Sequence, residues 1–234
     1  MTVHEIRRKL RKLGNKQRAK VSQGFFKTAP GEYGEGDVFW GIKVPELRKL
    51  AKECQDITVK EVKQLVRSSI HEERLLALLI LVLMYSKGNE TTKKRIYELY
   101  LKNTKFINNW DLVDGSAEYI VGDFLMDKSK KPLYSLAKSS DLWERRIAIM
   151  SSFHFIKRHE FSQTLKISRM LLSDEEDLIH KAVGWMLREV GKRHLPTEEK
   201  FLKEHYKKMP RTMLRYAIEK FPESKRQRYL KGNI

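Results

Sequence analysis

Apolar residues recur at three- and four-residue spacing along most of the chain, and this period is typical of amphipathic α-helices. No segment alternates apolar and polar residues as a half-buried strand does, and no β-hairpin dipeptide separates two apolar runs. The pattern therefore predicts an all-α protein of about a dozen helices, short and long mixed.

Several local signals mark where these helices begin. Thr58 with Glu61 and Asp141 with Glu144 have the spacing of a capping box. Four prolines stand at or near predicted first turns, where a missing backbone N–H costs nothing: Pro45, Pro132, Pro196 and Pro210. The glycine-rich stretch 31–36 follows no strand and lacks the Lys-Ser/Thr of a phosphate loop, so we interpret it as a connector.

Five of the predicted helices have a small or apolar residue at their centre, and these centres recur at a nearly constant interval. The interval is 36, 35, 36 and 33 residues between Ala77, Val113, Ala148, Gly184 and Ala217. Two helices with their turns fill such a repeat. The sequence thus predicts an α-solenoid of HEAT-like helical repeats, forming a single domain over residues 1–234, with a concave basic groove.

In each of these helices, the residues three before, one after and four after the centre lie on the same face of the helix and form one stripe. In the middle repeats this stripe and its neighbours are not apolar: they include Trp110 and Asp114, then Arg145, Arg146 and Ser152, then Lys181, Trp185 and Arg188. A single Trp is more often a core residue, and a single Arg is more often part of a surface ion pair. Aromatic rings, cations and one carboxylate in register instead favour a binding face.

The charge of the chain indicates what that face binds. The formal net charge is +18, with 48 Lys and Arg against 30 Asp and Glu. Residues 1–20 and 201–234 together hold 14 of these net charges. In a curved array both ends can flank one groove and meet the same phosphate backbone, so we expect a polyanionic partner. Solvated basic tails are the alternative interpretation.

Other functional classes lack their sequence signals. Cys54 is the only cysteine, and His154 and His159 stand five residues apart and face differently on a helix, so we expect neither a disulfide nor a metal site. The longest apolar run, 75–84, is too short to span a membrane. The first residues lack the apolar region of a secretory signal, and the expected location is the cytoplasm.

The predicted face holds a single well-placed carboxylate, that of Asp114, and no Ser/His/Asp or Cys/His triad, HExxH motif or two-carboxylate motif accompanies it. One carboxylate beside DNA suits hydrolysis of an N-glycosidic bond, because an anion stabilises the positive charge that develops on the sugar. A purine that alkylation has already made cationic leaves without a general acid. No second carboxylate is then required.

At these residues the chain resembles the AlkD family of alkylpurine DNA glycosylases, which are built from HEAT-like repeats. Four segments carry the resemblance: residues 39–45 (FWGIKVP), 109–114 (NWDLVD), 142–149 (LWERRIAI) and 181–189 (KAVGWMLRE). The resemblance implies excision of cationic N3- and N7-alkylated purines from duplex DNA, with no metal or other cofactor and without flipping the base into a pocket.

The resemblance also implies roles for single residues. Asp114 matches the family's catalytic carboxylate, and Trp110 and Trp185 match the tryptophans that pack against the deoxyribose and backbone of the lesion. Arg146 matches an arginine that holds the DNA, and Arg188 is expected to be a further DNA contact.

Three more cations, Arg145, Lys181 and Lys43, are expected to line the DNA groove. Lys43 departs from the family pattern, which has a neutral glutamine there. A cation at this place strengthens a phosphate contact but repels a positively charged lesion.

Two other functions fit the same features. The first is a non-catalytic protein that binds distorted or branched DNA, as some relatives of this fold are thought to do, although those relatives differ at the tryptophan and carboxylate positions. The second is a protein scaffold whose basic face meets an acidic partner. We expect a monomer, because charged ends give a solenoid no evident face for self-association.

Overall fold

The computed structural model describes residues 1–54 and 56–234. Within these residues the regular structure is helical, and the only strand-like pairing is an isolated bridge between Val38 and Ile70. The predicted all-α class is confirmed. Over the same described residues, no helix has the length and apolarity needed to cross a membrane.

The chain divides into two compact units, residues 1–120 and 121–234. A single domain over the whole chain therefore stays a prediction. The first unit contains α1 (Val3–Leu13), α2 (Lys16–Phe25), α3 (Val44–Glu53), α4 (Val59–Val66), α5 (His71–Lys87), α6 (Glu90–Leu101), the 3₁₀ turn η1 (Thr104–Phe106) and α7 (Trp110–Asp114). A π-helical turn, η2 (Glu118–Gly122), spans the division between the units.

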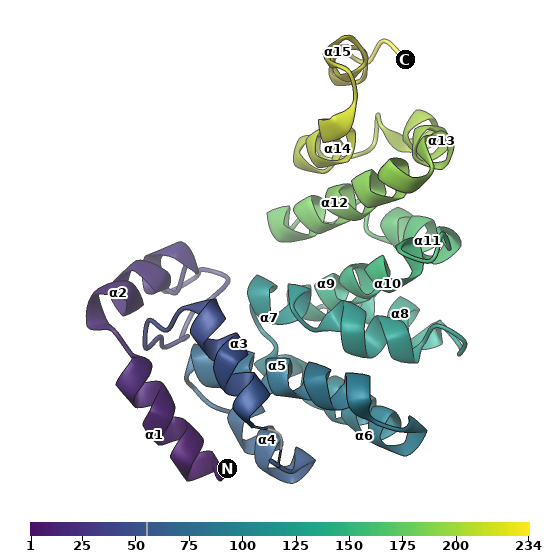
Figure 1. Ribbon diagram of the computed structural model, residues 1–234. Coiled ribbons are helices and arrows are strands. Elements are labelled where there is room, and N and C mark those ends of the chain that lie inside the picture. Colours follow the sequence, from purple (N-terminus) through teal and green to yellow (C-terminus); the bar gives the residue numbers. More distant parts are fainter. Residues whose placement is uncertain (55) are drawn as a thin grey trace. The chain divides into compact units, whose positions relative to one another are not determined.

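The second unit contains α8 (Lys131–Leu136), α9 (Leu142–Ser151), α10 (Phe153–Ile156), α11 (Ser162–Met170), α12 (Asp177–Arg193), α13 (Leu195–His205), α14 (Arg211–Ala217), the 3₁₀ turn η3 (Ile218–Lys220) and α15 (Glu223–Lys231). Helices that follow one another along the chain lie in successive layers of this unit (Figure 1).

The first unit is organised around α5, which packs against α3, α4, α6 and α7. Most of its apolar residues are buried, as expected of a central helix with neighbours on several sides, while Leu79 and 82–84 are half-buried. Leu76, Ala77 and Leu81 are fully inaccessible to solvent. This helix contains the apolar run 75–84, which is a core helix as its length predicts.

The second unit is organised in the same way around α12, which packs against α9, α11, α13 and α14. Gly184 of α12 allows α14 to pack closely against the α12 backbone. A Cβ atom at this position would lie 2.4 Å from the carbonyl oxygen of Met213 and 2.5 Å from Cβ of Tyr216.

The local signals mark helix starts as expected, with one difference: Asp141 accepts from the second residue of α9, whereas the predicted capping box with Glu144 would have it accept from the third. Thr58 caps α4 in a reciprocal capping box with Glu61, and the side chain of Asp141 caps α9 by accepting from the N–H of Trp143. The five repeat centres all lie in helices and are all buried, and these helices stack on their neighbours within each unit. A helical repeat architecture fits this arrangement, while the concave basic groove stays a prediction.

Candidate active site

The tryptophan and the carboxylate singled out from the sequence lie on α7, a helix of only five residues. Asn109 caps it by accepting from the N–H of Trp110 at 2.8 Å. Leu112 and Val113 are fully buried and fix one side of α7 in the core of the first unit. Trp110 and Asp114, in contrast, remain half-buried, which leaves both side chains partly accessible to a ligand.

A cluster of three phenylalanine rings supports Trp110 from one side. Its ring stacks on Phe26 at a centroid distance of 5.2 Å and meets the edge of Phe25 at 5.9 Å. Phe26 in turn stacks on Phe39 at 5.0 Å. Phe25 is 64% exposed, so the cluster extends from the core to solvent, with Trp110 beside its outer end.

Asp114 borders a hollow of about 300 Å³ in the first unit. Two exposed cations of α3, Arg48 and Lys52, line the same hollow, together with Tyr119, which is 45% exposed. The carboxylate therefore lies at an accessible surface that also presents positive charge. This is the combination needed to place a phosphate backbone beside an anion.

A second set of contacts anchors the residues that follow α7. The hydroxyl of Ser116 donates to the carbonyl oxygen of Leu112 and lies 2.9 Å from the hydroxyl of Tyr100. Burial raises the pKa of Tyr100 above its usual value, and the nearby Asp114 charge raises it further. The phenol is therefore neutral and serves as a fixed hydrogen-bonding group behind Asp114.

The first turn of α5 buries four consecutive polar or charged residues: His71, Glu72, Glu73 and Arg74. The carboxylate of Glu72 accepts hydrogen bonds from the backbone N–H groups of Trp40, Gly41 and Ile42. Gly41 has φ +75°, and a Cβ atom there would lie 2.4 Å from backbone atoms of α2 and its cap. The FWGIKVP segment is thus a tightly held connection, and its glycine is needed for both conformation and space.

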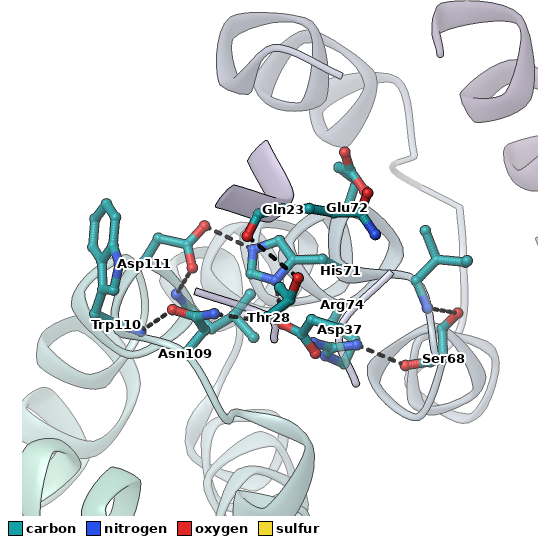
Figure 2. A network of polar contacts seen from close by, with 12 residues as sticks. Gln23, Thr28, Asp37, Ser68, His71, Glu72, Arg74, Asn109, Trp110 and Asp111 are labelled. Carbon is teal, nitrogen blue, oxygen red and sulfur yellow. Dashed lines mark hydrogen bonds and ion pairs between the residues drawn. The ribbon is translucent and has the colours of Figure 1, made fainter. Parts of the chain in front are cut away.

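His71 occupies the centre of a polar network that joins three parts of the first unit (Figure 2). Its Nδ1 atom lies 3.0 Å from Oδ2 of Asp37, and its Nε2 atom lies 2.9 Å from Oδ2 of Asp111. Arg74 donates to the other oxygen of Asp37 at 2.6 Å. The network connects the segment before α3, the start of α5 and the start of α7.

The network shifts the ionisation of its members in the directions that its charges dictate. Burial opposes ionisation of Asp37, but hydrogen bonds from His71 and the Arg74 charge outweigh it, and the pKa of Asp37 is lowered. Burial likewise opposes charging of His71, but hydrogen bonds to Asp111 and Asp37 outweigh it, and the pKa of His71 is raised. Both shifts favour the ion-paired state.

In the second unit, Trp185 lies on α12 and is half-buried, with its ring 6.2 Å from that of Phe153. Gly184 explains part of the GWMLRE string, because α14 packs against the backbone of α12 at this residue and leaves no space for a Cβ atom. Glu189, the last residue of this string, forms ion pairs with Lys192 and Arg193. Burial raises the pKa of Glu189, but the hydrogen bonds from these two cations outweigh burial and lower the pKa overall.

The two predicted arginines of α9 are both held by protein groups. Arg145 forms a two-pronged pair with Asp174, at 2.6 and 3.3 Å, and donates to two backbone carbonyls. Arg146 is only 5% exposed and donates to the carbonyl oxygen of Leu178 at 2.5 Å. A DNA contact by Arg145 has to compete with its pair, and a DNA contact by the buried Arg146 stays a prediction.

The predicted cations of α12 and α3 differ in their surroundings. Lys181 pairs with Asp177 at 2.7 Å one turn earlier, and Arg188 pairs with Glu219. Lys43 is exposed at the N-cap of α3. Of the predicted site residues, Trp110 and Asp114 come together on one short helix of the first unit. Trp185, Arg188 and Lys181 share one helix of the second unit, with Arg145 and Arg146 on another.

Neither the buried network nor the pair of cations beside Asp114 was predicted from the sequence. Arg48 and Lys52 stand one helical turn apart after Pro45, so their shared face was predictable. His71 carries no such signal, because its partners Asp37 and Asp111 lie far from it in sequence. No cluster of three or more His, Cys, Asp or Glu able to hold a metal ion occurs among the described residues.

The model of one protein family, described as "DNA alkylation repair enzyme", matches residues 6–221. The chain belongs to this family. Membership establishes a role in DNA alkylation repair and implies DNA as the partner. No curated protein matches the chain significantly.

Solved structures share the fold of this DNA alkylation repair protein at low sequence identity. A predicted DNA alkylation repair enzyme from Enterococcus faecalis is 18% identical with a TM-score of 0.68, covering 90% of this chain and 97% of its own. AlkD2 from Streptococcus mutans is 19% identical with a TM-score of 0.53, covering 89% and 99%. The protein smu.31 from Streptococcus mutans UA159 is 20% identical with a TM-score of 0.53, covering 77% and 93%.

Proposed function

We propose that the protein is a monofunctional DNA glycosylase that removes cationic N3- and N7-alkylated purines from duplex DNA. The observation that carries this proposal is the placement of Asp114 one helical turn after Trp110 on α7, with both side chains half-buried. Asp114 borders the hollow that Arg48 and Lys52 also line. Family membership supports the repair role. A surface that only bound phosphates would gain nothing from an anion at this place.

The proposed reaction needs few groups. The bond between C1′ and the purine nitrogen breaks, and its electron pair neutralises the cationic base. Positive charge develops on the sugar, and the Asp114 carboxylate stabilises it. A water molecule then adds to C1′ and releases a proton, with Asp114 available to orient it. The products are the free purine and an abasic site.

The surrounding residues supply binding and exclusion of water. The ring of Trp110, supported by Phe26, provides a flat apolar surface for the deoxyribose. Arg48, Lys52 and Lys43 are exposed and provide positive charge for the phosphates. In the second unit we assign Trp185 to the same duplex, and Arg188, Lys181, Arg145 and Arg146 to its backbone.

The test is release of methylated purines from alkylated duplex DNA, without added metal, by the wild type and Asp114→Asn. Removing one stabilising charge is expected to lower the single-turnover rate by about 10²- to 10³-fold, while affinity for undamaged duplex stays the same or increases. Glu98→Gln is the matched control, because it makes the same charge change at an exposed residue of α6 and should leave the rate unchanged.

Excision at equal rates by the wild type and Asp114→Asn would remove Asp114 from the mechanism. If neither protein releases a base while both bind duplex DNA, the enzyme proposal fails, and a non-catalytic binder of distorted or branched DNA takes its place. If the wild type does not bind duplex at low salt, the basic face serves an acidic protein partner instead.

A further inference from the structure

The network around His71 places one imidazole between two carboxylates that come from different segments. Asp37 precedes α3, His71 opens α5, and Asp111 is the second residue of α7. Both ring nitrogens lie within hydrogen-bond distance of a carboxylate oxygen. His71 itself is 1% exposed, so water does not replace either partner.

This geometry determines the charge of the ring. A neutral imidazole has one N–H and one lone pair, and here the lone pair would face a carboxylate oxygen. Two N–H donors satisfy both contacts, so His71 is the imidazolium. Arg74 then completes the balance: two cations, His71 and Arg74, meet two carboxylates, Asp37 and Asp111. A neutral total is what burial of charged groups requires.

The network also bears on α7. A helix of five residues has too few internal hydrogen bonds to be stable alone, so tertiary contacts must set its direction. Asp111 provides one such contact through His71, and it stands between Trp110 and Asp114 on the same turn. Asn109, the cap of α7, joins the network as well, since its amide lies 3.4 Å from Asp37.

We propose that His71, as an imidazolium bridging Asp37 and Asp111, is a positioning residue for base excision: it fixes α7 so that Trp110 and Asp114 face the sugar together. The proposal rests on the proposed glycosylase function. His71 does not touch the DNA in this mechanism. Its effect passes through Asp111 and is therefore expected in the rate of the chemical step rather than in DNA affinity.

The proposal predicts a specific dependence on pH. Among the described residues, the charged groups recorded against His71 are Asp37, Asp111 and Arg74, and the uncharged rings of Phe26 and Phe39 pack against it. Loss of the His71 proton at high pH turns one N–H into a lone pair facing a carboxylate and opens one bridge. The excision rate should therefore fall on the alkaline side, while duplex affinity does not fall with it.

Asp111→Asn tests this directly. The amide oxygen can accept from Nε2 of the imidazolium, and the amide N–H can donate to the lone pair of the neutral ring. Loss of the ring proton then no longer opens the bridge, so the alkaline decline in single-turnover rate should be flattened in this variant. We expect the ratio of rates at about pH 6 and about pH 8.5 to be smaller in Asp111→Asn than in the wild type by roughly tenfold. His71→Gln should lose about 10- to 100-fold at every pH, with duplex affinity within about twofold of wild type.

The same experiment includes a measurement that needs no substrate. Nitrogen chemical shifts of the His71 ring in the intact wild-type protein should show both nitrogens protonated at neutral pH, and Asp111→Asn should lower the pH at which one proton is lost. His4→Gln, a change at an exposed histidine of α1, is the matched control and should alter neither profile.

The outcomes separate the two proposals. A neutral His71 ring at neutral pH overturns the bridge, whatever the enzyme does. An alkaline decline in Asp111→Asn as steep as that of the wild type overturns the positioning role, even if the rate is lower at all pH values. Absence of excision by the wild type, with His71 doubly protonated, overturns the glycosylase proposal and the positioning role with it, and leaves the ionic bridge as a structural feature of α7.

Discussion

Single residues of this protein owe their chemistry to the groups that burial places around them. Glu72 and Glu198 are both almost fully buried carboxylates. Glu72 faces three backbone N–H groups, which satisfy its charge. Glu198 has an oxygen without a hydrogen-bond partner, and its neighbour Glu199 is also acidic. The same residue type is thus a stabilising anchor in one place and a buried acid that resists ionisation in the other.

Glu198 should therefore make stability depend on pH. Burial, and then the charge of Glu199, raise its pKa from 4.5 to about 8. Between these values the folded chain keeps a proton that the unfolded chain has released, so the free energy of unfolding falls as pH rises. Glu198→Gln should remove this slope and be more stable than wild type at pH 8 by about 1–3 kcal/mol.

Urea denaturation at about pH 5 and about pH 8 measures this effect. Glu98→Gln on α6 provides the control, because its side chain is exposed and should leave the slope of the wild type intact. A Glu198→Gln protein with the full wild-type slope would show that another group is responsible.

At the scale of helices, close approach matters more than helix propensity. Gly184 costs α12 some stability as a helix, yet it allows α14 to pack against the helix backbone. Gly24 lies in α2, where a methyl group added to the glycine would meet nothing within 4 Å. Gly184 therefore stabilises the fold through packing, whereas Gly24 only weakens its helix.

Gly184→Ala should destabilise the protein by about 1–3 kcal/mol, because the added methyl group forces α12 and α14 apart. Gly24→Ala, the same change in an open helix, should instead stabilise it by about 0.5–1 kcal/mol. Thermal unfolding of both variants gives the comparison. Equal effects of the two changes would contradict the packing role of Gly184.

At the scale of the whole molecule, the dominant property is a formal net charge of +18. Because DNA binding by cations releases counterions from the phosphates, the logarithm of the association constant should fall linearly with the logarithm of salt concentration. Such a line is expected for duplex DNA with or without lesions.

Removing Arg48 and Lys52 together, as glutamines, should reduce the steepness of that line by about two and weaken binding to all sequences alike. The control is the pair Lys94→Gln and Arg95→Gln, which removes the same charge from exposed residues of α6. Titrations of labelled duplex at several salt concentrations supply both slopes. If the two double variants behave alike, only net charge matters and the hollow beside Asp114 is not a phosphate site.

The helical class, several helix starts and the buried repeat centres could all be predicted from the amino-acid sequence. These features depend on residues near one another in the chain: Thr58 with Glu61, Asp141 at its helix start, and Ala77 and Ala148 as small buried residues at the centres of periodic helices. Periodicity and capping are local, so they are visible in the order of residues. The pairing of Trp110 with Asp114 on one turn is local too.

Which charged residues are buried, and which groups they contact, depends on the three-dimensional fold. Glu72 and Arg74 have the composition of a solvated first turn, yet the fold encloses both, and it brings His71 to Asp37 and Asp111 across more than thirty residues in each direction. The fold also pairs Arg145 with Asp174. The physical reason is that the energy of a charge depends on its solvent and its partners, and both are set by contacts between segments that the sequence leaves far apart.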